Sequence, residues 1–170
     1  RCFLLISFAG RMTSFSYDGV TTATPLAVLK NTGDLANVNV LNMFLGNIPG
    51  TIGETSVVCL LVGAAYLLIR RVIKPVIPFT YIGTFAVLIM IYAVASGRGF
   101  DLTFLAAHLC GGGLMLGAFF MATDYVTSPI TPAGKVVFGV ILGILTFCFR
   151  IYGGSAEGVS YAIIFSNLLV

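Results

Sequence analysis

Long apolar runs separated by short polar connections make up most of the chain after residue 51. Crossing about 30 Å of hydrocarbon takes roughly 20 residues of helix. Residues 52–69, 77–96 and 102–121 each reach about this length, residues 136–152 fall slightly short, and a further run begins near Val159. The pattern predicts an all-α integral membrane protein, a polytopic helical bundle with about five transmembrane spans.

The part before residue 51 has a different pattern. Residues 3–10 (FLLISFAG) look like the tail of another span, and residues 13–47 are mainly polar and turn-forming. A short apolar piece at residues 38–45 interrupts them, and we expect it to lie in the membrane interface or to re-enter the membrane. Connections of this length are usually functional or disordered.

We therefore expect one membrane domain over residues 1–170, with a loop at residues 11–50 and a transmembrane bundle at residues 51–170. The chain begins without Met and ends inside an apolar run, so we expect it to be the C-terminal part of a longer protein.

Composition agrees with this class and excludes others. The chain is 58% hydrophobic and only 9% charged, with a mean hydropathy of +1.05, whereas soluble domains are about 25% charged. The net charge of +3 comes from scattered residues that form no basic patch, so nucleic acid is not an expected partner. The four cysteines show no metal-ligand spacing, so neither a metal site nor a disulfide framework is predicted.

Charge also predicts the orientation in the cell membrane. The short connection at residues 70–78 carries Arg70, Arg71 and Lys74, and basic loops favour the cytoplasmic side. Counting spans back from it puts the loop at residues 11–50 on the outer face. Counting forward puts residues 124–135 inside.

Several residues within or beside the apolar runs allow more than one interpretation. The run Gly111, Gly112, Gly113 could let helices approach closely, or its missing side chains could make room for a flat ring. We expect His108 to pack between helices rather than to bind a ligand. Arg150 and Glu157 could pair at the outer end of the fourth span.

One polar stretch, residues 16–26 (SYDGVTTATPL), is unusual for so apolar a chain. A structural interpretation makes Thr24 a helix N-cap with Pro25 at the first helical position, preceded by a turn at Asp18 and Gly19. A functional interpretation is compatible with it. A helix N-terminus suits a phosphate, and a hydroxyl held there could be esterified to that phosphate.

A second polar stretch, residues 46–56 (GNIPGTIGETS), contains Glu54 where a span begins. A carboxylate well inside a bilayer costs about 2.5–3.5 kcal/mol or more. Glu54 could therefore be a hydrogen-bond acceptor for a bound group or a participant in a cation path. It could equally be a first-turn residue favoured by the helix dipole.

The stretch SYDGVTTATPL resembles the covalent flavinylation motif of the RnfD component of the Rnf electron-transport complex and of its relative, the NqrB component of the sodium-pumping NADH:quinone oxidoreductase. GNIPGTIGETS is similar to the GxxxGSxGETS segment that follows in both, and residues 121–154 and 157–169 resemble the last paired spans of RnfD. The resemblance implies that Thr24 carries FMN through a phosphoester bond. The implied recognition segment is Asp18, Gly19, Thr21, Thr22 and Ala23. Thr22 and Pro25 favour the Rnf member.

This resemblance implies an electron-carrier subunit of an ion-translocating ferredoxin:NAD+ oxidoreductase, coupled to Na+ or H+ movement and without catalytic residues of its own. Implied partners are a second FMN-carrying subunit, iron–sulfur and membrane subunits, membrane lipid and a flavin transferase that acts outside the cytoplasm. Whether a non-covalent riboflavin is also bound stays open. By analogy with channel-type urea-transporter folds, residues 46–56 and 124–132 would form broken or re-entrant polar segments.

Three alternatives remain open at this level. The nearest is the equivalent component of the quinone reductase. A small-solute channel or transporter without flavin would use the polar stretches to line a pore. A scaffold that anchors other subunits would leave the motif without a purpose.

Overall fold

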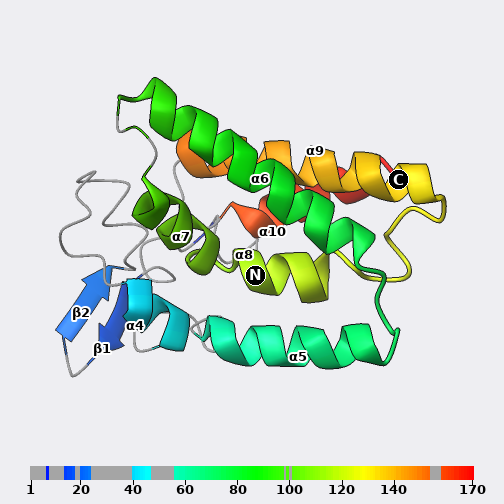
Figure 1. Ribbon diagram of the computed structural model, residues 1–170, viewed down its shortest axis with the longest axis horizontal. Helices are drawn as coiled ribbons and strands as arrows, with labels where there is room; N and C mark the ends of the chain where they lie inside the picture. Colours follow the sequence, from blue (N-terminus) through cyan, green and yellow to red (C-terminus); the bar gives the residue numbers. More distant parts are fainter. Residues whose placement is uncertain are drawn as a thin grey trace.

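The computed structural model describes residues 7, 14–17, 20–23, 40–46, 56–97, 99, 101–153 and 158–170 (Figure 1). Within these ranges the chain is a helical bundle with a small β-hairpin at one end. The expected span tail at residues 3–10 lies outside the described residues, apart from Ser7.

Among the described residues, two helices are long and apolar enough to cross a membrane: α6 (Val76–Ala95) and α9 (Pro132–Ile151), each of 20 residues. Helix α6 confirms the run at residues 77–96. Helix α9 is longer than its apolar run indicates, because the Thr131 side chain caps it by accepting a hydrogen bond from the backbone N–H of Gly134. Pro132 then occupies the first turn, where its missing N–H costs nothing. The prediction of a short fourth span was therefore wrong.

The apolar pattern at residues 102–121 predicts one continuous helix, but the structure does not have one there. The run is divided into α7 (Leu102–Cys110), α8 (Leu114–Leu116) and the π-helical turn η1 (Gly117–Met121), and the two halves are bent by 61°. Asp101 caps α7 by accepting hydrogen bonds from the N–H groups of Thr103 and Phe104. The pair has the form of a broken span or a re-entrant loop.

The remaining helices are shorter. Helix α5 (Val57–Ile69) has 13 residues and is capped by Ser56, and α10 (Val159–Asn167) has 9 residues. The described ranges therefore contain two candidate spans, or three if the bent pair counts as one. The five spans predicted from the sequence are therefore not all found in this part of the chain.

The segment before α5 contains structure that the sequence pattern does not indicate. Strands β1 (Ser14–Tyr17) and β2 (Val20–Ala23) pair antiparallel, which is an exception to the expected all-α fold. The apolar piece forms the short helix α4 (Val40–Leu45), which lies beside α5 and α7. Figure 1 places this hairpin at the end of the bundle opposite the α5–α6 connection.

Helices α6 and α9 form the centre of the bundle and run parallel to each other (Figure 1). Gly139 of α9 faces Thr80 of α6, and Gly143 faces Thr84 one turn further along. A glycine at every fourth position presents a flat helix face, so the two backbones approach closely. The sequence pattern alone does not distinguish these two glycines from the others in the chain.

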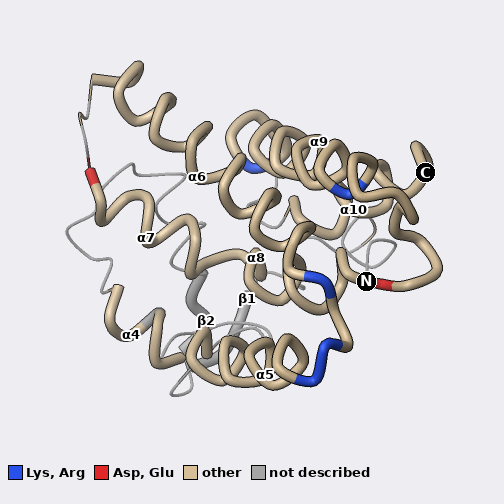
Figure 2. Tube along the Cα trace, turned by 45° about the vertical axis from the view of Figure 1, so that its right-hand side comes forward, with Lys and Arg blue, Asp and Glu red and all other residues tan. Residues whose placement is uncertain are grey.

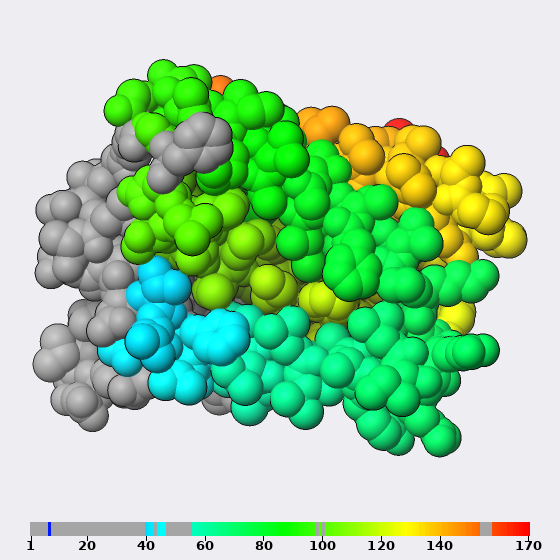
Figure 3. Space-filling model, viewed as in Figure 1, coloured from blue at the N-terminus to red at the C-terminus, as the bar shows by residue number. Residues whose placement is uncertain are grey.

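The outer faces of the bundle are apolar as well as its core. Tyr81, Phe85 and Ile89 of α6 are fully buried, whereas Phe79 and Ile91 of the same helix are 63% and 61% exposed. A helix that is apolar all round is expected for a membrane span. Figure 3 shows residues of the α8 region recessed between α5 and α6 on one face.

We expect Gly143→Ala to destabilise the bundle, because the added Cβ would lie 2.8 Å from Thr84 Cβ and 3.2 Å from the backbone nitrogen of Phe85. Overpacking of this kind costs about 1–3 kcal/mol. Gly83→Ala in α6 is the matched control, since nothing lies within 4 Å of the added atom. Thermal unfolding in detergent measures both, and equal midpoints would contradict the packing role of Gly143.

Candidate functional site

The residues of the expected flavin site divide between described and undescribed parts of the chain. Thr21, Thr22 and Ala23 form the end of strand β2, and the register pairs them with Ser16, Phe15 and Ser14 of β1. Asp18, Gly19, Thr24 and Glu54 lie outside the described residues. The expected recognition segment thus includes an extended strand of a hairpin, and Thr24 follows that strand directly in the sequence.

A second polar site lies inside the bundle, where the α7–α8 pair breaks. Gly112 and Gly113 both have φ of 66°, in the left-handed region. L-residues pay about 1–2 kcal/mol there, whereas glycine adopts it freely. The glycine run therefore ends α7 and turns the chain into α8. This is a third role, beside the two that the sequence left open for these glycines.

Arg150 of α9 binds the carbonyl groups at this break. Its Nη1 donates to the carbonyl oxygen of His108, and its Nη2 donates to those of Gly111 and Gly112, both at 3.2 Å. The side chain is only 1% exposed. A single guanidinium thus supplies donors to three carbonyl oxygens that belong to a helix end inside an apolar bundle.

Aromatic and hydroxyl groups surround this guanidinium. Its carbon lies 5.0 Å from the ring centroid of Phe85 on α6, in cation–π geometry. One turn earlier on each of these helices, the hydroxyls of Tyr81 and Thr146 share a hydrogen bond of 2.6 Å. Arg150 therefore connects three elements, α6, α9 and the broken pair.

His108 belongs to the same buried cluster. It is 5% exposed, and its ring lies 4.5 Å from that of Phe104, centroid to centroid, in an edge-to-face arrangement. Its burial agrees with the packing role expected for this histidine, while the ring contact with Phe104 lies within α7 itself. Its backbone carbonyl is one of the three that accept from Arg150.

The chemistry open to this cluster is electrostatic. Arginine stays protonated in proteins, so Arg150 cannot donate or accept a proton during a reaction. It can hold the break in one geometry and place a positive charge inside the bundle. Among the described residues no group of three or more His, Cys, Asp or Glu could hold a metal ion.

The sequence analysis placed Arg150 at the outer end of a span, in a pair with Glu157. Arg150 does lie in the last turn of α9, but its side chain is buried inside the bundle; Glu157 lies outside the described residues. An arginine flanked by apolar residues was the available signal, because an ionisable group in a span is costly unless it has a partner. The carbonyl partners could not be found, since backbone carbonyls carry no sequence signature.

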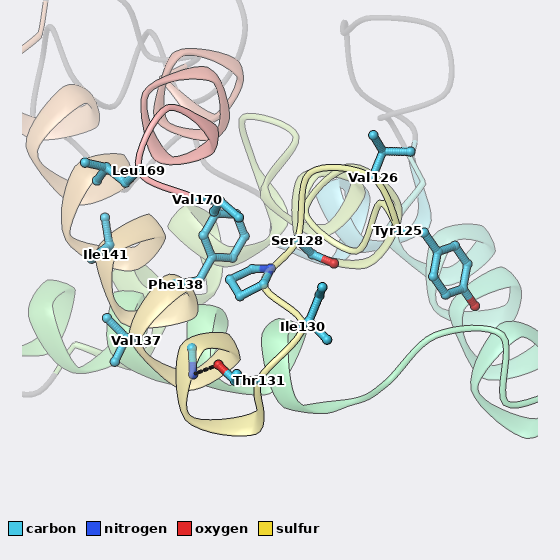
Figure 4. Close-up of a pocket in the computed structure, with 12 residues that line it drawn as sticks. Tyr125, Val126, Ser128, Ile130, Thr131, Val137, Phe138, Ile141, Leu169 and Val170 are labelled. Atoms are coloured by element: carbon cyan, nitrogen blue, oxygen red, sulfur yellow. Dashed lines mark hydrogen bonds between the residues drawn. The ribbon is translucent and has the colours of Figure 1, made fainter.

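A separate cavity of about 480 Å³ lies at the end of the bundle where α9 begins (Figure 4). It is lined by the loop before α9, by the first turns of that helix and by the end of the chain after α10. Most of its lining is apolar, including Val126, Ile130 and Phe138, while Ser128 and Thr131 add hydroxyls. It is distinct from the Arg150 cluster.

Comparison with known proteins assigns this chain to a protein family. The family described as NQR2, RnfD, RnfE matches residues 1–170, the whole of the sequence. The chain belongs to the NQR2, RnfD, RnfE family. Family membership confirms the resemblance on which the expected flavin site depends.

Individual relatives agree with the family match. The D component of the Na+-translocating ferredoxin:NAD+ oxidoreductase complex of Acetobacterium woodii is 42% identical over 99% of the chain and 52% of its own length. The D component of the proton-translocating ferredoxin:NAD+ oxidoreductase complex of Clostridium ljungdahlii is 39% identical over 98% of the chain and 54% of its own length. The D component of the ion-translocating oxidoreductase complex of Rhodobacter capsulatus is 39% identical over 85% of the chain and 41% of its own length. The chain spans about half the length of these relatives.

Replacing Arg150 with Leu should destabilise the protein by at least about 3 kcal/mol, because three carbonyl groups lose a charged donor. Arg150→Lys keeps the charge, but a lysine cannot reach all three carbonyl groups. We therefore expect this variant to lose an intermediate amount of stability. Arg70→Leu, at an exposed position, should change little. Unfolding in detergent would report the order, and a stable Arg150→Leu protein would refute the role of this contact.

Gly113→Ala should cost about 1–2 kcal/mol, since alanine would have to adopt the left-handed conformation seen at this position. Gly83→Ala, within the regular helix α6, is again the matched control and should be neutral or slightly stabilising. Unfolding midpoints of the two variants, measured side by side, test this. A neutral Gly113→Ala would mean that the break does not require glycine.

Proposed function

We propose that this chain is part of a membrane-embedded electron-carrier subunit of an Rnf-type ferredoxin:NAD+ oxidoreductase, in which Thr24 carries FMN through a phosphoester bond. The complete protein would couple electron transfer to Na+ or H+ transport within a multi-subunit complex. Relatives named as the D component of such complexes, at about 40% identity, support this role.

The observation that carries the proposal is the position of the recognition segment. Thr21, Thr22 and Ala23 form the end of strand β2, which lies outside the long apolar helices, and Thr24 is the next residue in the chain. A threonine hydroxyl is chemically able to form a phosphoester. A recognition segment outside the long apolar helices suits a modifying enzyme better than one within a helix buried in lipid.

Orientation supports the same assignment. The hairpin lies at the end of the bundle opposite the connection that carries Arg70, Arg71 and Lys74 (Figure 1). If that basic connection is cytoplasmic, as the positive-inside rule favours, the hairpin faces outward.

The roles of the individual residues follow from this arrangement. The hydroxyl of Thr24 would hold the phosphate covalently, which prevents loss of the group and limits its distance from neighbouring carriers. Asp18, Gly19 and the strand residues Thr21 to Ala23 would form the segment that the flavin transferase recognises. Glu54 would accept a hydrogen bond from the loop or the bound group. The bound FMN would supply one-electron redox chemistry.

Mass spectrometry of the protein, purified from cells that contain the flavin transferase, tests the proposal. We expect the peptide containing Thr24 to carry the mass of FMN less one water, and Thr24→Ala to lose it together with the yellow colour. Thr13→Ala, earlier in the same segment, should keep both. An unmodified Thr24 peptide from a colourless, folded protein would favour the channel or scaffold interpretation instead.

A further inference from the structure

Two lysines from different elements come together at the end of the bundle away from the hairpin. Lys74 lies in the α5–α6 connection just before α6, and Lys135 lies in the opening turns of α9. Their side chains are close enough for the two charges to interact. Figure 2 shows the Lys and Arg segments of the α5–α6 connection and of the start of α9 at the same end. We refer to Lys74 and Lys135 as the lysine pair.

The surroundings of the lysine pair add further positive charge and do not neutralise the charge of the two lysines. Because α6 and α9 are parallel, both helix N-termini, with their partial positive charge, lie at this end. No side chain caps the N-terminus of α6. Asp124, the one acid at this end among the described residues, accepts a hydrogen bond from Thr127, and no described carboxylate pairs with either lysine.

An apolar cavity adjoins this electropositive end. Gly134 and Val137, on either side of Lys135 in the sequence, both line the cavity of about 480 Å³. Figure 4 shows Val137, Phe138 and Ile141 along one wall, with Leu169 and Val170 beside them and Ile130 opposite. The site thus combines a place for a negative charge with a place for a hydrocarbon chain.

We propose that an anionic phospholipid binds here, with its phosphate at the lysine pair and the two helix N-termini and an acyl chain in the cavity. Basic pockets between membrane helices on the cytoplasmic side suit such headgroups. Phosphate also suits the N-terminus of α6, which no side chain caps, while α9, already capped by Thr131, contributes the partial positive charge of its dipole. The proposal is independent of the flavin assignment, and it needs only that α6 and α9 cross the membrane.

The lipid source is favoured over a soluble anion because of the cavity lining. A free phosphate would satisfy the lysine pair and leave the apolar cavity to water. A lipid fills both at once, and in a spanning bundle the ends of α6 and α9 lie at the level where headgroups meet hydrocarbon.

Native mass spectrometry of the protein in detergent, with whichever subunits co-purify, would measure lipid retention. Phosphatidylglycerol and phosphatidylcholine with identical acyl chains are the probes. We expect retention of phosphatidylglycerol only, and the double variant Lys74→Gln/Lys135→Gln should weaken it at least about tenfold. Val137→Phe, which narrows the cavity and leaves the lysine pair in place, should also weaken it.

The matched control is Arg70→Gln/Arg71→Gln, which removes the same charge from the same end without touching the lysine pair. It should retain the lipid to within about threefold. Equal losses in the two double variants would mean that general surface charge, not a site, attracts the lipid. Displacement by inorganic phosphate would identify a soluble anion instead. If lipid binds only after the partner subunits are stripped away, the lysine pair contacts an acidic surface of a partner subunit in the complex. Each of these three outcomes would overturn the proposal.

Discussion

The contact between Arg150 and the carbonyl groups of the α7–α8 break is the interaction on which the rest of the bundle depends. A helix that ends inside an apolar environment leaves carbonyl groups that water cannot satisfy, and each unsatisfied group is costly. Arg150 supplies donors to three of them from a neighbouring helix. The same contact helps to hold an arginine in the interior, because the carbonyl dipoles and the ring of Phe85 stabilise its charge there.

This contact requires the close packing of α6 against α9. Gly139 and Gly143 bring α9 near enough to α6 for Tyr81 to reach Thr146 and for Phe85 to lie against Arg150. Arg150 lies in the last turn of α9, where a positive charge is favoured by the helix dipole. One side of α9 therefore carries, in order along the helix, Gly139 and Gly143, then Thr146, then Arg150.

The parallel arrangement of α6 and α9 also separates the two ends of the molecule chemically. One end gathers both helix N-termini and the lysine pair, and it adjoins an apolar cavity. The other end carries the β1–β2 hairpin. This separation follows from helix direction together with the placement of a few basic residues.

Much of this could be predicted from local patterns. The apolar run at residues 77–96 predicted α6 closely, because a span of this length needs only hydrophobicity. The motif around Thr24 predicted the family, which the comparison confirmed over the whole chain. The hairpin was missed because each strand has only four residues: the alternation in β1 (SFSY) is too brief to stand out from the surrounding polar stretch, and β2 (VTTA) does not alternate. The apolar run at residues 136–152 puts the start of α9 too late, because the first turn of the helix after the Thr131 cap is not apolar throughout.

The sequence alone determined the membrane class, the position of α6 and the family, because each depends on residue types at neighbouring positions. Only the tertiary structure decided where the run at residues 102–121 breaks, which carbonyls Arg150 binds and that Lys74 meets Lys135. Glycine permits a break but does not require one, and an arginine in an apolar run calls for a partner without naming it. Those choices depend on which helices lie side by side, and that is set by packing across the bundle rather than by any single stretch of chain.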